Sequence, residues 1–147
     1  MTLRAIPLIA IAFILYNVMA LTGVEFGHCI STAEKACANS YLFAVPMPNG
    51  SGARWVFNWG DLLIIVTLLM LFVELLKSTY TSTSSLVDHA LSMLLMIACL
   101  VEFILVPKAA TSVFFIILFA TVIDVIAGYT IGIRVAKRDV SFGGGDS

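Results

Sequence analysis

The most informative shortage in this 147-residue sequence is charge, since Asp, Glu, Lys and Arg together make up only 12% of it. A soluble domain carries about 25% charged residues and uses them to cover its surface. Hydrophobic residues make up 61% of the chain, and its mean hydropathy is +1.06. If the apolar runs were core helices of a soluble protein, too little polar sequence would remain to cover them. We therefore expect an integral membrane protein.

Several chemistries lack the residues they need. The formal net charge of −1 provides no basic surface for phosphates, which argues against a nucleic-acid partner. The sequence has neither a glycine-rich phosphate loop nor a recognisable nucleophile–base motif. Its two histidines, His28 and His89, fall on opposite sides of the predicted topology and cannot share a haem or metal ion. We therefore expect no enzyme activity, no cofactor and no metal site.

Four apolar runs dominate what is present. A transmembrane helix needs about 20 apolar residues to cross the bilayer core, and the shorter second run is preceded by the aromatic residues Trp55, Phe57 and Trp59, typical of a membrane interface. We predict an all-α fold, an integral membrane four-helix bundle over residues 1–138 with one structured external loop at 24–60. A disordered cytoplasmic tail is expected at 139–147, and the helices are expected at about residues 5–23, 61–77, 88–106 and 112–134.

The first run also has features of a cleaved signal peptide. Arg4 supplies a positive start, and Val18-Met19-Ala20 resembles a cleavage site. Apolar sequence continues past that site, and Tyr16 and Asn17 interrupt the hydrophobic stretch, which favours a retained helix. Cleavage would leave the other three helices unaffected.

The placement of Lys and Arg predicts the orientation, because the cytoplasmic segments of membrane proteins are enriched in them. Arg134, Lys137 and Arg138 cluster at the end of the fourth predicted helix, which places the C-terminus in the cytoplasm. Four crossings then place the N-terminus there as well and put loop 24–60 outside.

Cys29 and Cys37 both lie in this external loop. In an oxidising compartment they could form a disulfide, which would stabilise so short a loop by about 2–3 kcal/mol. A redox-active dithiol usually has Cys-x-x-Cys spacing, whereas seven residues separate these two. A structural disulfide is therefore favoured over thiol-redox catalysis. Cys99, in the third predicted helix, is interpreted as a packing residue.

The external loop is more than a linker. Its apolar segment around Tyr41, Leu42, Phe43 and Val45 is expected either to lie on the membrane surface or to form a short strand. Asp61 directly precedes the second apolar run and is interpreted as the N-cap of that helix.

Charged side chains within a membrane are costly and are the first functional candidates. The predicted helices hold three of them, Glu74, Glu102 and Asp124. Glu74 lies three residues before Lys77, a spacing that permits an ion pair and indicates a structural role. Glu102 shares one helical face with Ser92 and Cys99, beside Ala98, and that face is expected to contact protein rather than lipid.

Asp124 is the deepest of the three carboxylates and lies within a stripe of small residues. Small residues at every fourth position let another backbone approach closely, so the stripe is expected to be a helix-packing interface, within this chain or with another. Tyr16, Asn17 and Thr67 are candidate partners for Asp124. The stripe consists of Ala120, Asp124, Gly128, Gly132 and Ala136.

Several segments together carry a resemblance to a known family. They are Val45-Pro46-Met47-Pro48, Trp55, Trp59-Gly60-Asp61-Leu62-Leu63, Val101-Glu102-Phe103, residues 110–115 and residues 123–128. From about residue 43 to the tail, the chain resembles a group of uncharacterised small four-helix proteobacterial inner-membrane proteins. The resemblance implies a bacterial inner membrane and brings no activity with it.

Two functions remain open at this point. The leading hypothesis is a non-enzymatic accessory or assembly subunit of a membrane complex, with the lipid bilayer and other membrane subunits or copies of itself as partners. The alternative is a small proton- or ion-coupled transporter or channel that uses Glu102 and Asp124. Polar contacts that hold helices together are favoured over a carboxylate relay. Thiol-redox activity at Cys29 and Cys37 is a third, minor possibility.

Overall fold

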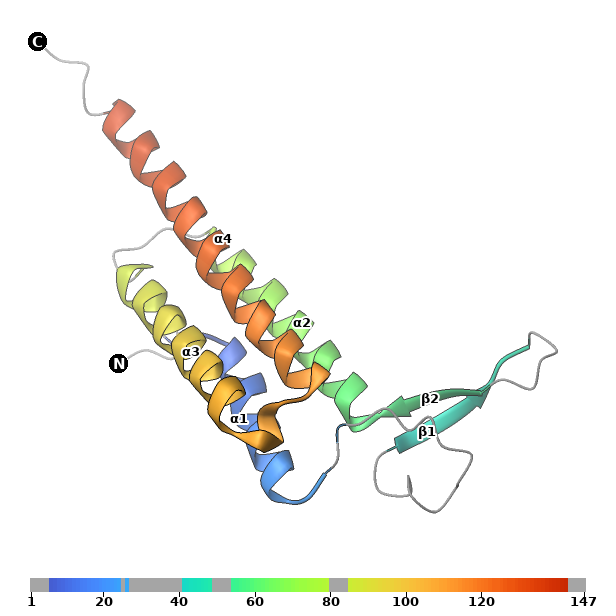
Figure 1. The fold of residues 1–147 in the computed structure, drawn as a ribbon. Helices are drawn as coiled ribbons and strands as arrows, with labels where there is room; N and C mark the ends of the chain where they lie inside the picture. Colours follow the sequence, from blue (N-terminus) through green and yellow to red (C-terminus); the bar gives the residue numbers. More distant parts are fainter. Residues whose placement is uncertain (1–5, 25, 27–40, 49–53, 80–84, 143–147) are drawn as a thin grey trace, which may run out of the picture.

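The computed structural model describes residues 6–24, 26, 41–48, 54–79 and 85–142, which form four α-helices and one β-hairpin (Figure 1). Consecutive helices run in opposite directions along the bundle. We call the end that holds the hairpin the hairpin end, and the end beyond which α4 extends the tail end. The elements are α1 (Ile9–Leu21), β1 (Tyr41–Pro46), β2 (Arg54–Asn58), α2 (Trp59–Ser78), α3 (Ser85–Leu105), the short 3-10 helix η2 (Pro107–Ala109) and α4 (Ser112–Phe142).

Three of the helices, α2, α3 and α4, are each long and apolar enough to cross a membrane. In contrast, α1 has only 13 residues and is therefore about 20 Å long. We predicted this helix from residue 5, but residues 6–8 are not helical and Leu8 is the N-cap. Pro7 has no N–H group and commonly stands at the start of a helix, which is consistent with the later beginning.

A glycine ends α1. Gly23 has a φ of 85°, in the left-handed region that residues with a Cβ rarely adopt. This conformation lets the N–H of Val24 donate to the carbonyl of Met19 at 3.2 Å, and that of Gly23 donate to Ala20 at 3.4 Å. The two bonds form a Schellman motif, which satisfies carbonyls that the helix end leaves without partners.

β2 continues directly into α2, and a capping box marks the junction. The Asn58 side chain accepts a hydrogen bond from the Asp61 N–H at 2.9 Å, and the Asp61 carboxylate accepts one from the Asn58 N–H at 3.0 Å. Asn58 is therefore the N-cap and Asp61 occupies the third helical position. Our assignment of Asp61 as the N-cap was wrong, because the helix begins two residues before it, at Trp59.

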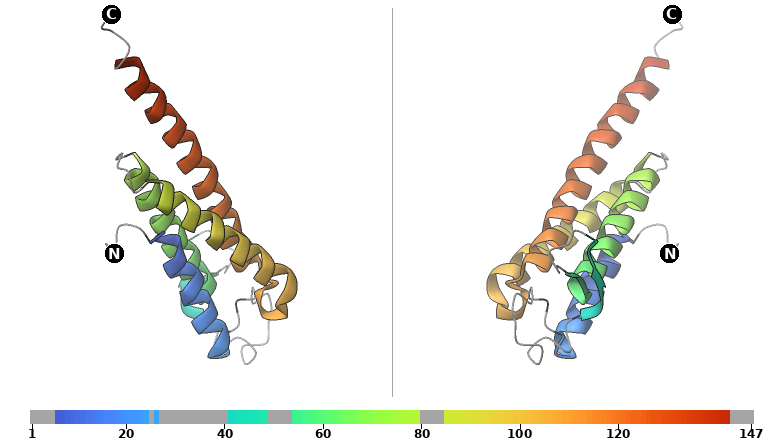
Figure 2. Two further views of the ribbon diagram at one scale, coloured as in Figure 1. Left: turned by 90° about the vertical axis from the view of Figure 1, so that its left-hand side faces the viewer. Right: turned by 90° about the vertical axis from the view of Figure 1, so that its right-hand side faces the viewer.

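The fourth helix is longer than predicted. It reaches Phe142, whereas a disordered tail was expected from residue 139. Its 31 residues correspond to a length of about 46 Å. Its C-terminal part therefore extends well beyond the other helices at the tail end (Figures 1 and 2).

The apolar segment of the loop forms the first strand of an antiparallel hairpin, one of the two possibilities that the sequence left open. Phe43 pairs with Phe57, and Val45 pairs with Trp55. The rings of Phe43 and Phe57 stack with their centroids 4.8 Å apart, and Trp55 meets Phe57 edge-on at 5.7 Å. The described part of the chain is thus a helical bundle with a small β-element attached to α2.

The bundle is organised around α4, which packs against both α2 and α3, while α1 packs against α2 and α4. Its main core lies toward the hairpin end and is centred on Phe114, which is fully buried. The ring of Phe114 contacts that of Tyr16 edge-on, with centroids 4.8 Å apart. A second, smaller core consists of Ile9, Leu71 and Ala120.

Candidate functional site

The polar side chains of the bundle gather in two groups. We call the first the hairpin-end cluster. We call the second the central cluster because it joins α2, α3 and α4, although it lies toward the tail end of α2 and α3. The hairpin-end cluster consists of Tyr16, Asn17, Glu102, Thr111 and the backbone carbonyl of Lys108. The central cluster consists of Glu74, Lys77, Asp88, His89, Ser92 and Asp124.

In the hairpin-end cluster, Tyr16 connects α1 to the corner between α3 and α4. Its hydroxyl donates to the Lys108 carbonyl at 2.8 Å and lies 2.8 Å from the Thr111 hydroxyl oxygen. Because the tyrosine proton is used on the carbonyl, the Thr111 hydroxyl is left to donate to the tyrosine oxygen. Thr111 in turn accepts from the Phe114 N–H at 3.2 Å and so caps the first turn of α4.

Asn17 links α1 to α3 in the same cluster. Its side-chain amide donates to the Glu102 carboxylate at 3.3 Å and to the Phe13 carbonyl at 3.2 Å. Glu102 is half-buried, so one of its oxygens has a partner from another helix. A contact between a carboxylate and an amide stabilises helix association where water is scarce.

The central cluster is built around Glu74, whose side chain is buried. One carboxylate oxygen accepts the backbone N–H of Leu8 at 2.8 Å, and the other accepts the Lys77 ammonium at 3.1 Å. Leu8 is the N-cap of α1, where backbone N–H groups lack partners within the helix and the helix dipole favours an anion. Glu74 therefore stabilises the start of α1 from α2, in addition to forming the predicted ion pair with Lys77.

Lys77 extends the cluster to α3. Its ammonium lies 3.6 Å from Asp88 as well as 3.1 Å from Glu74, so one cation bridges two carboxylates. The other oxygen of Asp88 is buried and has no hydrogen-bond partner among the described residues.

Asp124 enters the cluster from α4 and is buried. Ser92 on α3 is its side-chain hydrogen-bond neighbour, and Glu74, Lys77 and His89 lie close enough to act on its charge. His89 also stacks on Tyr129, with ring centroids 5.9 Å apart. The cluster thus joins α2, α3 and α4.

The predicted partners of Asp124 were wrong. Asn17 bonds to Glu102, Tyr16 bonds to Lys108 and Thr111, and the Thr67 hydroxyl donates to the carbonyl of Leu63 in its own helix at 2.7 Å. Glu102 and Asp124, the two carboxylates of the predicted transporter, lie in different clusters. Glu102 is near Tyr16 and Asn17, whereas the carboxylate near Asp124 is Glu74.

The small-residue stripe of α4 faces the other helices as far as the structure describes it. Ala120 and Asp124 are buried, and a Cβ added at Gly128 would meet the His89 ring at 3.4 Å, an ordinary contact distance. The burial of Gly132 and Ala136 lies outside the described part. On α3, Ser92 and Cys99 are buried as expected, but Ala98 faces outward.

Nothing in the sequence indicated that Gly60 is the described glycine packed most closely against another helix. A Cβ at Gly60, in the first turn of α2, would lie only 2.8 Å from a methyl group of Val113 on α4. Trp59-Gly60-Asp61 is no spaced small-residue motif, so periodicity could not reveal this close approach.

Two other predictions concern cysteines and metals. Cys29 and Cys37 lie outside the described residues, so the proposed disulfide stays a prediction. Cys99 is fully buried, which agrees with a packing role. Within the described ranges, no three His, Cys, Asp or Glu side chains are placed so that they could hold a metal ion.

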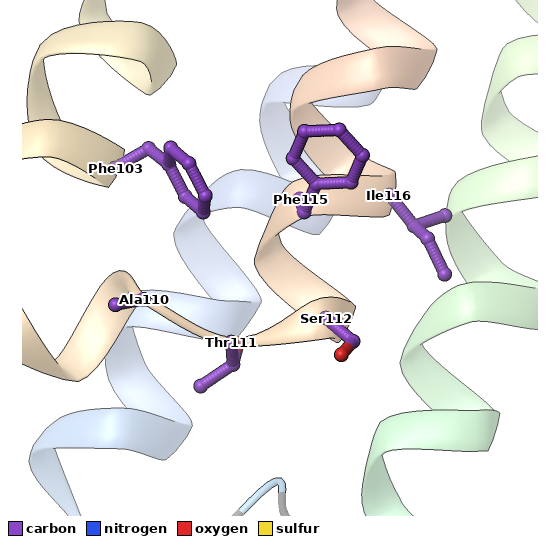
Figure 3. Close-up of a pocket in the computed structure, with 6 residues that line it drawn as sticks. All are labelled: Phe103, Ala110, Thr111, Ser112, Phe115 and Ile116. Atoms are coloured by element: carbon purple, nitrogen blue, oxygen red, sulfur yellow. The ribbon is translucent and has the colours of Figure 1, made fainter.

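An open groove of about 510 Å³ lies between the end of α3 and the start of α4 (Figure 3). The rings of Phe103 and Phe115 stand along it, with centroids 5.7 Å apart. None of the carboxylates of the two clusters lines it, but Thr111 belongs both to its lining and to the hairpin-end cluster. Its lining residues are Phe103, Ala110, Thr111, Ser112, Phe115 and Ile116.

Comparisons with family models, curated proteins and solved structures find no match to this chain. The functional argument therefore rests on the clusters themselves. Hydrogen bonds between helices can hold a bundle together, and the hairpin-end cluster joins α1 to α3 and to the α3–α4 corner. The central cluster combines three carboxylates with one ammonium and one imidazole, groups that can also exchange protons.

Proposed function

We propose that the chain is an integral membrane protein in which α2, α3 and α4 cross the bilayer. One observation carries this proposal. Of the apolar stretches of α2, α3 and α4, only 28%, 11% and 33% of the residues are buried inside the bundle. Some of the remaining side chains are partly buried against the core, but many apolar ones are exposed on the outside of the bundle, an arrangement that water would oppose and that lipid tails accommodate.

In this proposal α1 is an incomplete fourth span. It extends about 20 Å from the hairpin end, so Leu8 lies within the bilayer at the depth of the central cluster. Non-helical backbone at such a depth is tolerated only where protein satisfies its polar groups. The bond from the Leu8 N–H to Glu74 and the burial of Pro7 support this placement.

We place the tail end in the cytoplasm and the hairpin end outside, with both termini on the cytoplasmic side. The arginines and lysine of the α4 extension, Arg134, Lys137 and Arg138, support this orientation through the positive-inside rule. The sequence resemblance described above favours the inner membrane of a bacterium.

We propose a non-enzymatic role as an accessory or assembly subunit of a membrane complex. The hairpin-end cluster supports it, because its hydroxyl, amide and carboxylate groups are partnered within this chain and act between helices. Extraction from its own membrane in a mild detergent, followed by size-exclusion chromatography and mass spectrometry, tests the role. We expect co-purification with another membrane subunit or a stable oligomer, and a monodisperse monomer would contradict it.

The central cluster favours a second candidate, a small proton- or ion-coupled transporter or channel. The sequence-based hypothesis used Glu102 and Asp124. Because Asp124 lies close to Glu74, Lys77 and His89, the proposal now uses Glu74 and Asp124. The test is ion- or proton-dependent flux in proteoliposomes. Glu74→Gln and Asp124→Asn should abolish flux while Glu102→Gln leaves it, and flux equal to the wild type in Asp124→Asn would exclude this role.

Thiol-redox activity remains the minor proposal, and it requires Cys29 and Cys37. Their Cys→Ser variants would lose activity under that proposal, and would lose only stability if the two residues form a structural disulfide.

A further inference from the structure

The β-hairpin exposes apolar side chains on both of its faces. Phe43, Val45 and Trp55 lie on one face, Val56 lies on the other, and Leu42 is the extra residue of an irregularity at the start of β1. Each of these five side chains is between 38% and 49% exposed. A two-stranded hairpin is at best marginally stable in water by itself, and a contiguous exposed apolar patch usually marks a contact surface.

The hairpin is joined to the helices at a defined junction. β2 passes into α2 without a linker, and the capping box between Asn58 and Asp61 holds the junction. From there the strands project sideways, across the direction of the helices (Figure 1). Strands of six and five residues reach about 17–20 Å at about 3.3 Å per residue. The hairpin therefore lies beside the bundle, at the level where α2 begins.

That level coincides with the edge of the apolar helices. Trp59 begins α2, and the apolar stretch of α4 begins at Ser112 at the same end of the bundle. After the buried residues Phe57, Asn58 and Gly60 at the junction, outward-facing apolar side chains resume on α2 with Leu62 and Ile65. In the proposed arrangement, these two side chains face lipid just below the hairpin.

We infer that the hairpin lies flat in the headgroup zone of the outer leaflet, with the lipid interface as the partner of its exposed apolar side chains. The inference rests on the proposed membrane crossing. The headgroup zone suits this composition, because aromatic rings concentrate there. It also contains water for the unpaired strand edges, which the hydrocarbon core lacks. Arg54, at the turn end of β2, carries the cation that suits a lipid phosphate.

Fluorescence of the two tryptophans tests this placement. Trp55 lies on the hairpin and Trp59 begins α2, and the chain has no other tryptophan. Trp59→Phe therefore reports on the hairpin and Trp55→Phe reports on the start of α2. Each full-length variant is placed in vesicles of zwitterionic and anionic phospholipid, with or without bromine near the headgroup end of the acyl chains. We expect brominated lipid to quench both tryptophans and the emission of Trp55 to be shifted to the blue.

The outcomes separate the two proposals. If Trp59 is quenched by brominated lipid and Trp55 is not, the membrane crossing stands and the hairpin inference is overturned. Iodide in the buffer then tells whether Trp55 lies in water, where it is quenched, or under a second copy or another protein, where it is protected. If neither tryptophan responds to brominated lipid, the membrane crossing itself fails.

A second measurement removes the dependence on the variants. Wild-type chain in vesicles containing a phospholipid with a photoreactive group close to the headgroup is irradiated, digested and analysed by mass spectrometry. We expect lipid adducts within residues 41–58. Adducts confined to the helices would overturn the inference.

Discussion

The carboxylate of Glu74 accepts the backbone N–H of Leu8 at 2.8 Å, across 66 positions of sequence. A side chain of α2 thereby satisfies the N–H of the N-cap residue, which in a capping box is accepted by the third residue of the helix, and Leu8 itself has no side-chain acceptor. The same carboxylate binds Lys77. One buried anion thus holds both the start of α1 and the cation that reaches Asp88 on α3.

Replacing Glu74 tests this relationship. Glu74→Ala removes the acceptor of the Leu8 N–H and one partner of Lys77, and we expect it to lower the free energy of unfolding by about 1–3 kcal/mol. Glu74→Gln keeps an oxygen for the Leu8 N–H and loses only the ion pair, so its effect should be smaller. Denaturant titration in detergent micelles, followed by circular dichroism, measures both. The outward-facing Leu76→Ala is the control, and equal losses in the Ala and Gln variants would contradict the capping role.

The Tyr16–Thr111 contact is suited to a double-mutant cycle. Tyr16→Phe keeps the ring packed against Phe114 and removes one hydroxyl, and we expect a loss of about 1 kcal/mol. Thr111→Val removes the other hydroxyl together with the cap on α4. Because the two hydroxyls bond to each other, the cycle should give a coupling energy of about 0.5 kcal/mol or more.

The control for this cycle is Thr130→Val, because the Thr130 hydroxyl bonds only within α4. Tyr16→Phe and Thr130→Val should be additive in unfolding titrations. Additivity of Tyr16→Phe with Thr111→Val would mean that their hydroxyls do not interact.

Replacing Gly60 or Gly128 by alanine should change stability in opposite directions. Gly60→Ala places a methyl group 2.8 Å from Val113, and overpacking of this kind costs about 1–3 kcal/mol. Gly128→Ala meets His89 only at 3.4 Å and gains up to about 1 kcal/mol of helix propensity, so stability should be unchanged or higher. Val113→Ala should relieve the Gly60→Ala variant in unfolding titrations. If Gly128→Ala lowered the free energy of unfolding more than Gly60→Ala, the contact at Gly128 in the small-residue stripe would be the tighter of the two.

The capping box at the start of α2 gives a prediction on local structure. Asn58→Ala removes the acceptor of the Asp61 N–H, and N-caps of this kind contribute about 1 kcal/mol. Asn58→Ser supplies another capping side chain and should retain most of the stability. Amide hydrogen exchange over residues 58–63 should accelerate in the Ala variant and stay close to wild type in the Ser variant. Unchanged exchange in Asn58→Ala would show that the box does not hold this junction.

The sequence predicted the three long helices well, because each is a long apolar run that no other class of element accommodates. It failed at the start of α1, where the decisive contact comes from Glu74, far away in sequence. Periodicity placed Asp124 and Ser92 on protein-facing sides of their helices, but it cannot tell which helix faces which. Only the structure could therefore identify the neighbours of Asp124 and the close approach of Gly60 to Val113.

The direct junction of β2 and α2 has a mechanical consequence. Two strands joined to the end of a helix without a linker can act as a lever arm. A small rotation of α2 about its own axis sweeps the turn of the hairpin through a much wider arc, and resistance at the turn is transmitted back as torque. Because Glu74 and Lys77 lie on the same helix, a rotation of α2 transmitted from the hairpin would also change the angle at which these two charges meet α1 and α3.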